Sequence, residues 1–166
     1  MKKYELTNET KVVFGTTLYR IRALIAFGYV SVGDLGGWIE NESNLAHDGN
    51  AWVYGDARVS GDARVYGDAR VYGDARVSGN AEVSGNAEVL RPVHLLTIGA
   101  IGSRDGCTTF FRTKEKQIKA SCGCFLGTVA EFAEKVKRTH GNSKHAKTYA
   151  IAIELAKAQI EDVEDK

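Results

Sequence analysis

The sequence predicts a mainly β fold in which short strands wind into a solenoid, followed by a smaller α+β module. Two observations predict the solenoid: a six-residue period that holds without a slip over residues 53–89, and a Gly-Asp or Gly-Asn pair in each unit. A third observation, a change to helical spacing of apolar residues after residue 128, predicts the separate module at the C-terminal end.

Composition limits the function classes. The chain has 166 residues, with 22 Lys and Arg against 21 Asp and Glu, so no global field draws it to nucleic acid or to a membrane. Three cysteines are too few for a disulfide scaffold and fit a reducing cytoplasm. We expect no signal peptide and no membrane span, because no apolar run follows the first lysines and the apolar stretch 18–27 is short.

The N-terminal segment, residues 1–32, reads as a β-hairpin cap. The stretches "KYELT" and "KVVFGTTLYRIRALIAF" are rich in the residues that strands favour. A solenoid needs such a cap, because an open coil exposes a row of unpaired backbone groups.

The repeat places valine at every sixth position from Val53 to Val89. The same register extends upstream to Ile39 and downstream to Cys107, with one insertion of two residues after Leu45. Alternate side chains of a strand share a face, so the Ala and Val of each A-R-V unit point inward and the Arg points outward. Glycine accepts the positive φ of the corner that follows. We therefore predict about four stacked coils over residues 33–107.

An aliphatic residue at the first position of each hexad and a small one at the fifth resembles the hexapeptide-repeat family of left-handed parallel β-helices. The resemblance implies three hexads per coil, so that residue i lies beneath residue i+18, and a homotrimer. The chain departs from the pattern where Tyr or Ser replaces the usual Gly or acidic residue. The stretch "GDLGGWIENESNLAHDGNAWVYGDARV" also resembles phage and prophage proteins described as polymer-forming or transferase-like.

The C-terminal module, residues 108–166, is predicted to hold a hairpin and two helices. Thr128 and Glu131 have the spacing of a capping box at the start of the first helix. A second helix is expected over residues 143–163. Its apolar positions are Tyr149, Ile153, Ala156, Ile160 and Val163. This face either packs within the module or forms a helix–helix seam between subunits.

At eighteen residues per coil, the outward side chains form columns with steps of about 4.8 Å. The predicted columns are Trp38–Arg58–Arg76–His94, Asn44–Arg64–Glu82–Ala100 and Trp52–Arg70–Glu88–Gly106. In the second and third columns an arginine meets a glutamate on the next coil, which predicts structural ion pairs.

The first column has two stacked arginines and no acid. Trp38 offers Arg58 a cation–π contact. One interpretation is that corner acids neutralise the column; these are Asp56, Asp74 and Glu40. The other is a site for phosphate, nucleotide or carboxylate, with Arg58, Arg76, Trp38 and His94 as its ligand-binding residues.

Beside the third column, Tyr54, Tyr72 and Leu90 are predicted to stack into an exposed apolar stripe. Such stripes mark contacts between molecules. We expect this one to be the interface of the trimer.

Many hexapeptide-repeat proteins are acyltransferases that use coenzyme A or acyl carrier protein, with a histidine base near the subunit boundary. His47, in the insertion beside Asp48, is the candidate for such a base, and Asp48 is the candidate for the group that orients its ring. The alternative is that His47 is an ordinary solvated corner residue.

The sequence predicts no metal and no cofactor. Cys122 and Cys124 lack the paired spacing of a zinc site and, by alternation, are expected on one strand face as small core residues. The basic stretch 112–147 has nine Lys and Arg, and Phe110 and Phe111 before it form a candidate stacking pair for bases.

We therefore expect a non-enzymatic accessory protein of phage or prophage type in the bacterial host cytoplasm. It would bind or scaffold, engaging a host protein or a small anionic ligand, and the resemblance implies action against host defence. The alternatives are a hexapeptide-class acyltransferase and a nucleic-acid-binding accessory protein.

Overall fold

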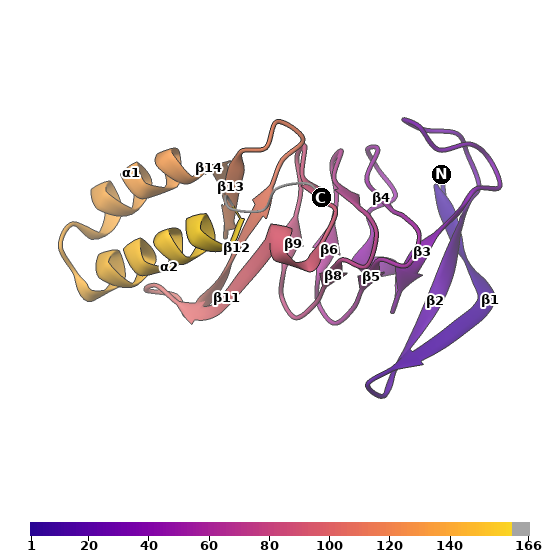
Figure 1. Cartoon of the computed structure of the whole chain (residues 1–166), viewed down its shortest axis with the longest axis horizontal. Helices are drawn as coiled ribbons and strands as arrows, with labels where there is room; N and C mark the ends of the chain where they lie inside the picture. The colour runs from indigo at the N-terminus through magenta and orange to yellow at the C-terminus, as the bar shows by residue number, and fades with distance from the viewer. Residues whose placement is uncertain (161–166) are drawn as a thin grey trace. The chain divides into compact units, whose positions relative to one another are not determined.

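The computed structural model describes residues 1–160 of the 166-residue chain. The chain folds as two compact units, which divide between Pro92 and Val93. We call them the solenoid unit and the C-terminal unit (Figure 1). Each is described by itself.

An antiparallel hairpin opens the solenoid unit. Strands β1 (Tyr4–Val13) and β2 (Thr16–Ala23) are joined at Phe14 and Gly15, both of which have positive φ. Strand β3 (Leu35–Ile39) pairs antiparallel with β2 and parallel with the second coil of the solenoid. The hairpin therefore continues one sheet of the solenoid and covers the edge of its first strand (Figure 1).

The solenoid itself is built from two-residue strands, one for each unit of the repeat. They are β4 (Trp52–Val53), β5 (Arg58–Val59), β6 (Arg64–Val65), β7 (Arg70–Val71), β8 (Arg76–Val77), β9 (Glu82–Val83) and β10 (Glu88–Val89). They form three parallel sheets, β3-β5-β8, β4-β7-β10 and β6-β9, and a bridge from Leu45 to Val65 extends the last of these. Each coil thus contributes one segment to each of three faces.

The register confirms the eighteen-residue coil. Arg58 pairs with Arg76, and Trp52 pairs with Arg70. For the strand before the insertion, the separation between register partners is two residues longer, since Trp38 pairs with Arg58. The two-residue insertion therefore lies where the sequence predicts it, in the corner between Leu45 and Trp52.

The interior of the coils consists of the alanines and valines of the repeat, none more than 1% exposed. These residues are Ala51, Val53, Ala57, Val59, Ala63, Val65, Ala69, Val71, Ala75, Val77, Ala81, Val83, Ala87 and Val89. Burying this apolar surface coil upon coil is what stabilises a unit that is too short to have a core of its own.

Asn44 does not lie in an outward column. It is fully buried, and its side-chain amide donates to the carbonyl oxygens of Gly61 and Ala63, both at 2.9 Å. The sequence prediction of an outward Asn44 is therefore wrong, because this amide satisfies backbone groups of the next coil.

The repeat ends earlier than residue 107. Parallel pairing stops at β10, and the 3₁₀ helix Pro92–His94 follows. Strand β11 (Leu95–Ile101) pairs antiparallel with β12 (Gly106–Arg112), so the solenoid has three coils where the sequence predicts about four. Pro92 has no N–H to donate to a further coil, so one ladder hydrogen bond is missing where the hexad register of Leu95, Ile101 and Cys107 would continue the coils.

The C-terminal unit is a four-stranded antiparallel sheet with two helices. Its order is β11-β12-β13-β14, with β13 at Ile118–Cys122 and β14 at Phe125–Thr128. Helix α1 (Val129–His140) begins at the predicted capping box, in which Thr128 Oγ1 accepts from the Glu131 amide at 3.3 Å and the Glu131 carboxylate accepts from the Thr128 amide at 2.7 Å.

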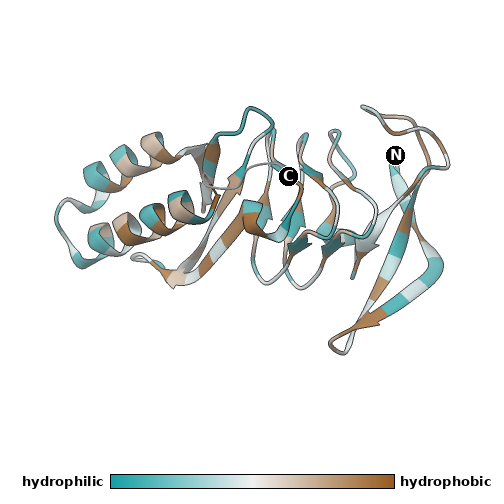
Figure 2. Cartoon of the chain, in the orientation of Figure 1, coloured by the Kyte–Doolittle hydropathy of each residue, from teal (hydrophilic) through white to brown (hydrophobic). Residues whose placement is uncertain are grey.

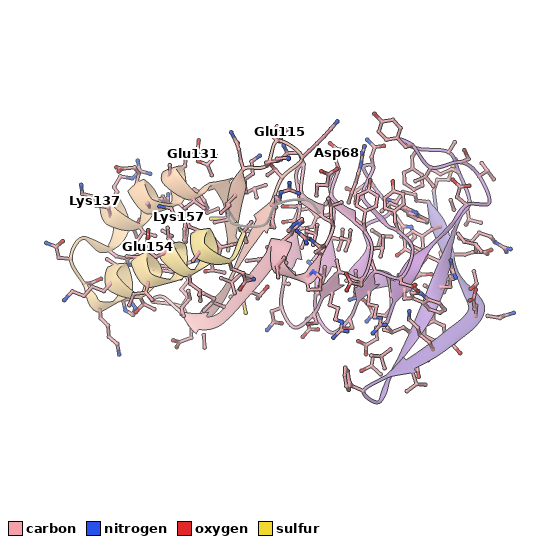
Figure 3. All side chains as sticks on the ribbon, in the orientation of Figure 1. Asp68, Glu115, Glu131, Lys137, Glu154 and Lys157 are labelled. Carbon is pink, nitrogen blue, oxygen red and sulfur yellow. The ribbon has the colours of Figure 1, made fainter. Side chains whose placement is uncertain are left out.

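Helix α2 (Lys144–Ile160) packs against α1 and the sheet. Hydrophilic and hydrophobic residues alternate along both helices in Figure 2, as expected of amphipathic helices. Lys137 of α1 and Glu154 of α2, both labelled in Figure 3, are exposed. Tyr149, Ile153, Ala156 and Ile160 are buried in the core of this unit.

The alternative of a helix–helix seam between subunits is therefore wrong for these four residues, since α1 and the sheet already cover them. Val163 lies outside the described residues. In the part of the chain that the structure describes, no helix has both the length and the apolar character needed to cross a membrane.

Candidate functional site

Strands β3, β5 and β8 bring three residues of the predicted first column together. Trp38 is the register partner of Arg58, and Arg58 is the partner of Arg76 on the next coil. Arg58 is half-buried and Arg76 is exposed. The column is therefore formed as predicted over these three positions, and two guanidinium groups lie on adjacent strands.

Two further cations come from the hairpin. Lys11 of β1 places its ammonium 4.1 Å from the centre of the Trp38 ring, and the Arg20 guanidinium of β2 lies 5.4 Å from it. The sequence prediction gave this cation–π role to Arg58. The hairpin supplies the cations because β2 pairs with β3, which sets Arg20 opposite Trp38.

The acids near this cluster are exposed or engaged elsewhere. Lys11 pairs with Asp56 at 3.7 Å and Arg20 with Glu9 at 3.5 Å, and these carboxylates are 80% and 54% exposed. Ion pairs with such exposed partners contribute about 0–1 kcal/mol. Glu40 instead accepts a hydrogen bond from the Gly61 amide at 2.6 Å.

The positive charges also act on one another. Burial and the nearby Arg58 lower the pKa of Lys11, Arg20 acts in the same direction, and Asp56 opposes them. This pattern is that of a cationic cluster with too few acids. A bound anion would relieve the repulsion.

His94, the fourth residue of the predicted column, lies outside the solenoid unit. It ends the 3₁₀ helix after the repeat, is fully buried, and belongs to the C-terminal unit. The first column ends at Arg76, since β8 is the last strand of its sheet. A fully buried imidazole is not open to a ligand from solvent, so the site described below consists of residues of the solenoid unit.

The other two columns run Arg64–Glu82 and Trp52–Arg70–Glu88 across adjacent coils. Each arginine therefore stands opposite a glutamate in register, as predicted. Ala100 and Gly106, the predicted ends of these columns, lie instead in the antiparallel sheet of the C-terminal unit.

The tyrosine stripe forms as predicted in its stacking. The rings of Tyr54 and Tyr72 lie 4.3 Å apart and are nearly parallel, with an interplanar angle of 8°. Both rings and Leu90 are half-buried. Burial, followed by the neighbouring Tyr72 phenol, raises the pKa of Tyr54 to about 12. The Arg70 guanidinium lies beside the stripe, 4.6 Å from the centre of the exposed Tyr29 ring.

His47 lies at a hollow of about 430 Å³ on another face of the solenoid. The hollow is lined by Glu42, Ser43, Leu45, Ala46, His47, Asp48, Arg64, Val65, Tyr66 and Glu82. The His47 ring stacks on Tyr4 with 4.3 Å between ring centres, and its Nδ1 accepts from the Lys3 amide at 3.2 Å. Its Nε2 lies 3.8 Å from the Glu42 carboxylate.

The hydrogen bond at Nδ1 determines which nitrogen of His47 carries the proton. An imidazole nitrogen that accepts a hydrogen bond carries no proton, so neutral His47 carries its proton on Nε2. In this tautomer Nε2 is a hydrogen-bond donor, and the lone pair of Nδ1 is engaged by the Lys3 amide, so neither ring nitrogen is free to accept a substrate proton. The groups that orient the ring are Lys3 and Tyr4, where the sequence suggested Asp48.

Lys3 holds the insertion in place. It is 1% exposed, and its ammonium donates to the carbonyl oxygens of Asp48, Gly49 and Ala51 at 3.4, 3.4 and 2.9 Å. Burial lowers the pKa of Lys3 to about 8, against the opposing effect of Asp48. The sequence pattern gives no sign of this lysine, which lies outside the repeat.

Two predictions about the C-terminal residues need correction. Phe110 and Phe111 are both fully buried, so they are not available to stack on bases. Cys122 is half-buried, with its Sγ 3.2 Å from the Thr108 hydroxyl, whereas Cys124 is exposed after the turn at Gly123. The two cysteines therefore do not share a core face. Within residues 1–160 no group of three His, Cys, Asp or Glu residues is placed to hold a metal ion.

Comparison with known proteins concerns mainly the repeat. A family model described as "YdcK Beta solenoid repeat" matches residues 51–67, 57–73, 63–79 and 69–85. A protein of Escherichia coli (strain K12) named "Uncharacterized acetyltransferase YdcK" is 39% identical over 62 residues, which cover 32% of this chain and 19% of that protein. The chain thus spans about a fifth of that relative. These matches support a β-solenoid repeat family for the coils.

Proposed function

We propose that this β-solenoid repeat protein is a non-enzymatic binding protein that holds a small anion at the Trp38–Arg58–Arg76 column. The observation that carries the proposal is the stacking of two arginines on adjacent coils beside Lys11, near acids that are exposed or bound elsewhere. Arginine guanidinium groups bind phosphate and carboxylate through paired hydrogen bonds.

The proposal includes a left-handed solenoid and a trimer. Left-handedness is supported by the eighteen-residue coil with Ala and Val inside, which fits the hexapeptide pattern. Phage or prophage origin, the bacterial cytoplasm and action against host defence rest on the resemblance of residues 33–59 alone. A host protein is the other partner that the solenoid would present or engage.

Titration calorimetry tests the anion site. A panel of inorganic phosphate, a nucleoside monophosphate, succinate and coenzyme A is titrated into the full chain. We expect at least one small anion to bind, and we expect Arg58→Gln or Arg76→Gln to weaken it at least about tenfold, because each removes a charge-assisted hydrogen bond. Arg64→Gln is the matched control, an outward arginine opposite Glu82 on another face.

Circular dichroism shows that each variant is folded before its affinity is compared. The proposal is abandoned if the folded Arg58→Gln and Arg76→Gln proteins bind as tightly as the unmodified chain. It is equally abandoned if nothing in the panel binds.

The trimer is proposed to form through Tyr54, Tyr72 and Leu90. We expect the double variant Tyr54→Asp, Tyr72→Asp to be monomeric by multi-angle light scattering, since it puts two charges into an apolar contact. Tyr66→Asp is the control, because Tyr66 occupies the same position of the repeat on another face. A double variant that keeps the oligomer of the unmodified chain contradicts this interface.

Acyl transfer is the second candidate function. Two observations favour it: the name of the E. coli relative, and the hollow of about 430 Å³ beside His47. It predicts coenzyme A binding in the same panel and loss of turnover in His47→Ala. Coenzyme A binding that survives Arg58→Gln but not a change at the hollow would replace the anion proposal with this one.

Nucleic-acid binding is the third candidate. Exposed Lys135, Lys137 and Arg138 lie near the C-terminus of α1, where the helix dipole favours cations in any case. With Phe110 and Phe111 buried, only phosphate contacts support it.

A further inference from the structure

The hairpin changes what the arginine column can bind. We propose that hairpin and solenoid together form one phosphate-binding site, in which Lys11, Arg58 and Arg76 contact the phosphate oxygens. This proposal rests on the proposed function and deepens it, because it names the ligand class and adds a residue outside the repeat. Arg20 is a positioning residue, since it packs on Trp38 and donates to the Gly36 carbonyl at 3.1 Å.

The donors approach from two sides. Arg58 and Arg76 occupy one face of the solenoid in successive steps of about 4.8 Å. The Lys11 ammonium reaches the same place from β1, since it lies over Trp38, which is the register partner of Arg58. A carboxylate has two oxygens, which one guanidinium fork satisfies. Two forks and an ammonium suit a tetrahedral anion with more oxygens.

The charge of the cluster points to a dianion. Of the four cations Lys11, Arg20, Arg58 and Arg76, only two form ion pairs, with the carboxylates of Asp56 and Glu9. In this cluster of described residues the ion pairs are Lys11 with Asp56 and Arg20 with Glu9, and no carboxylate lies within 4.0 Å of the Arg58 or Arg76 guanidinium nitrogens. The two remaining positive charges match a phosphate near neutral pH.

Trp38 is too covered to bind the part of a ligand that lies beyond its phosphoryl group. The Trp38 side chain is 6% exposed, and Lys11 and Arg20 both lie against its ring. It is therefore a support for cations and offers no open face for a base or sugar to stack on. Affinity should come from the phosphoryl group, so inorganic phosphate itself is a suitable probe.

The experiment is calorimetric titration of inorganic phosphate into the full chain. We expect Lys11→Gln to weaken phosphate binding at least about tenfold, because it removes a charged donor. We expect Lys11→Arg to stay within about threefold of the unmodified chain, because the charge is kept, and the control Arg64→Gln to leave affinity unchanged. Lys11→Gln with full affinity overturns the role of the hairpin.

A second measurement needs no variant. Phosphate added to ¹⁵N-labelled protein should shift the backbone resonances of Lys11, Arg58 and Arg76 together, and saturating shifts confined to other residues overturn the site. Comparing the affinities of glucose 6-phosphate and inorganic phosphate shows whether the site prefers a phosphate monoester or the free ion.

The two proposals fail in different ways. Succinate binding that depends on Arg58 and Arg76, with no binding of phosphate or glucose 6-phosphate, keeps the anion site and rejects the phosphate ligand. Phosphate binding that survives Arg58→Gln and Arg76→Gln rejects the anion site itself. Phosphate binding lost in those two variants but kept in Lys11→Gln rejects only the contribution of the hairpin.

Discussion

Replacing Val71 by aspartate should unfold the solenoid unit under conditions in which the unmodified chain is folded. Val71 is fully buried in the middle coil, between Val53 of the coil before and Val89 of the coil after. A carboxyl group there would face only alanine and valine side chains, and burying it costs at least about 4 kcal/mol. Each coil is stabilised mainly by its neighbours, so the loss should spread to both sides.

Urea denaturation followed by circular dichroism measures this effect. Ser78→Asp is the matched control, since it places the same carboxyl group at an exposed position directly after the buried Val77. We expect the control to lie within about 0.5 kcal/mol of the unmodified chain. Similar denaturation midpoints for Val71→Asp and Ser78→Asp would show that Val71 does not face a packed interior.

Replacing Gly36 by alanine should destabilise the solenoid unit by about 1–3 kcal/mol or more. A Cβ atom at this position of β3 would lie 2.5 Å from Ile21 Cγ1 and 2.7 Å from both Trp52 Cζ2 and the Val53 carbonyl oxygen. These neighbours come from the hairpin and from the first coil. They must move apart to admit one methyl group, because the packing there leaves no space.

Gly106→Ala is the control for this prediction. Gly106 also lies in a strand, and a Cβ atom there would meet nothing within 4 Å. Neither glycine has positive φ, so the comparison isolates packing from backbone strain. Thermal unfolding of the two variants gives the difference, and equal melting temperatures would contradict the tight packing of β3 on the first coil.

The sequence predicts the coils well because their period is a local property of the chain. Valine at every sixth position and glycine at every corner determine which side chains point inward, and that determines the register of eighteen residues. The same spacing predicts two stacks of outward side chains, the column Trp38–Arg58–Arg76 and the pair Tyr54 and Tyr72.

The end of the repeat was harder to predict. Leu95, Ile101 and Cys107 continue the spacing of six, yet Leu95 and Ile101 lie in β11, which pairs antiparallel with β12, the strand that contains Cys107. A short apolar alternation satisfies a solenoid strand and an antiparallel strand equally well. Which of them forms depends on the strand that pairs with it, here β12, which in turn pairs with β13.

In the candidate site, too, some residues could be predicted from the period and others could not. Arg58 and Arg76 came from the periodicity of the sequence, whereas Lys11 and Arg20 lie outside the repeat, where no period relates them to Trp38. They reach Trp38 only because β2 pairs with β3 and carries β1 beside it. The sequence by itself therefore determined the coil and the stacking of its residues, which depend on spacing along one chain segment. Only the tertiary structure decided where the coils end and which hairpin cations join the column, because strand pairing between distant segments is fixed by packing and not by period.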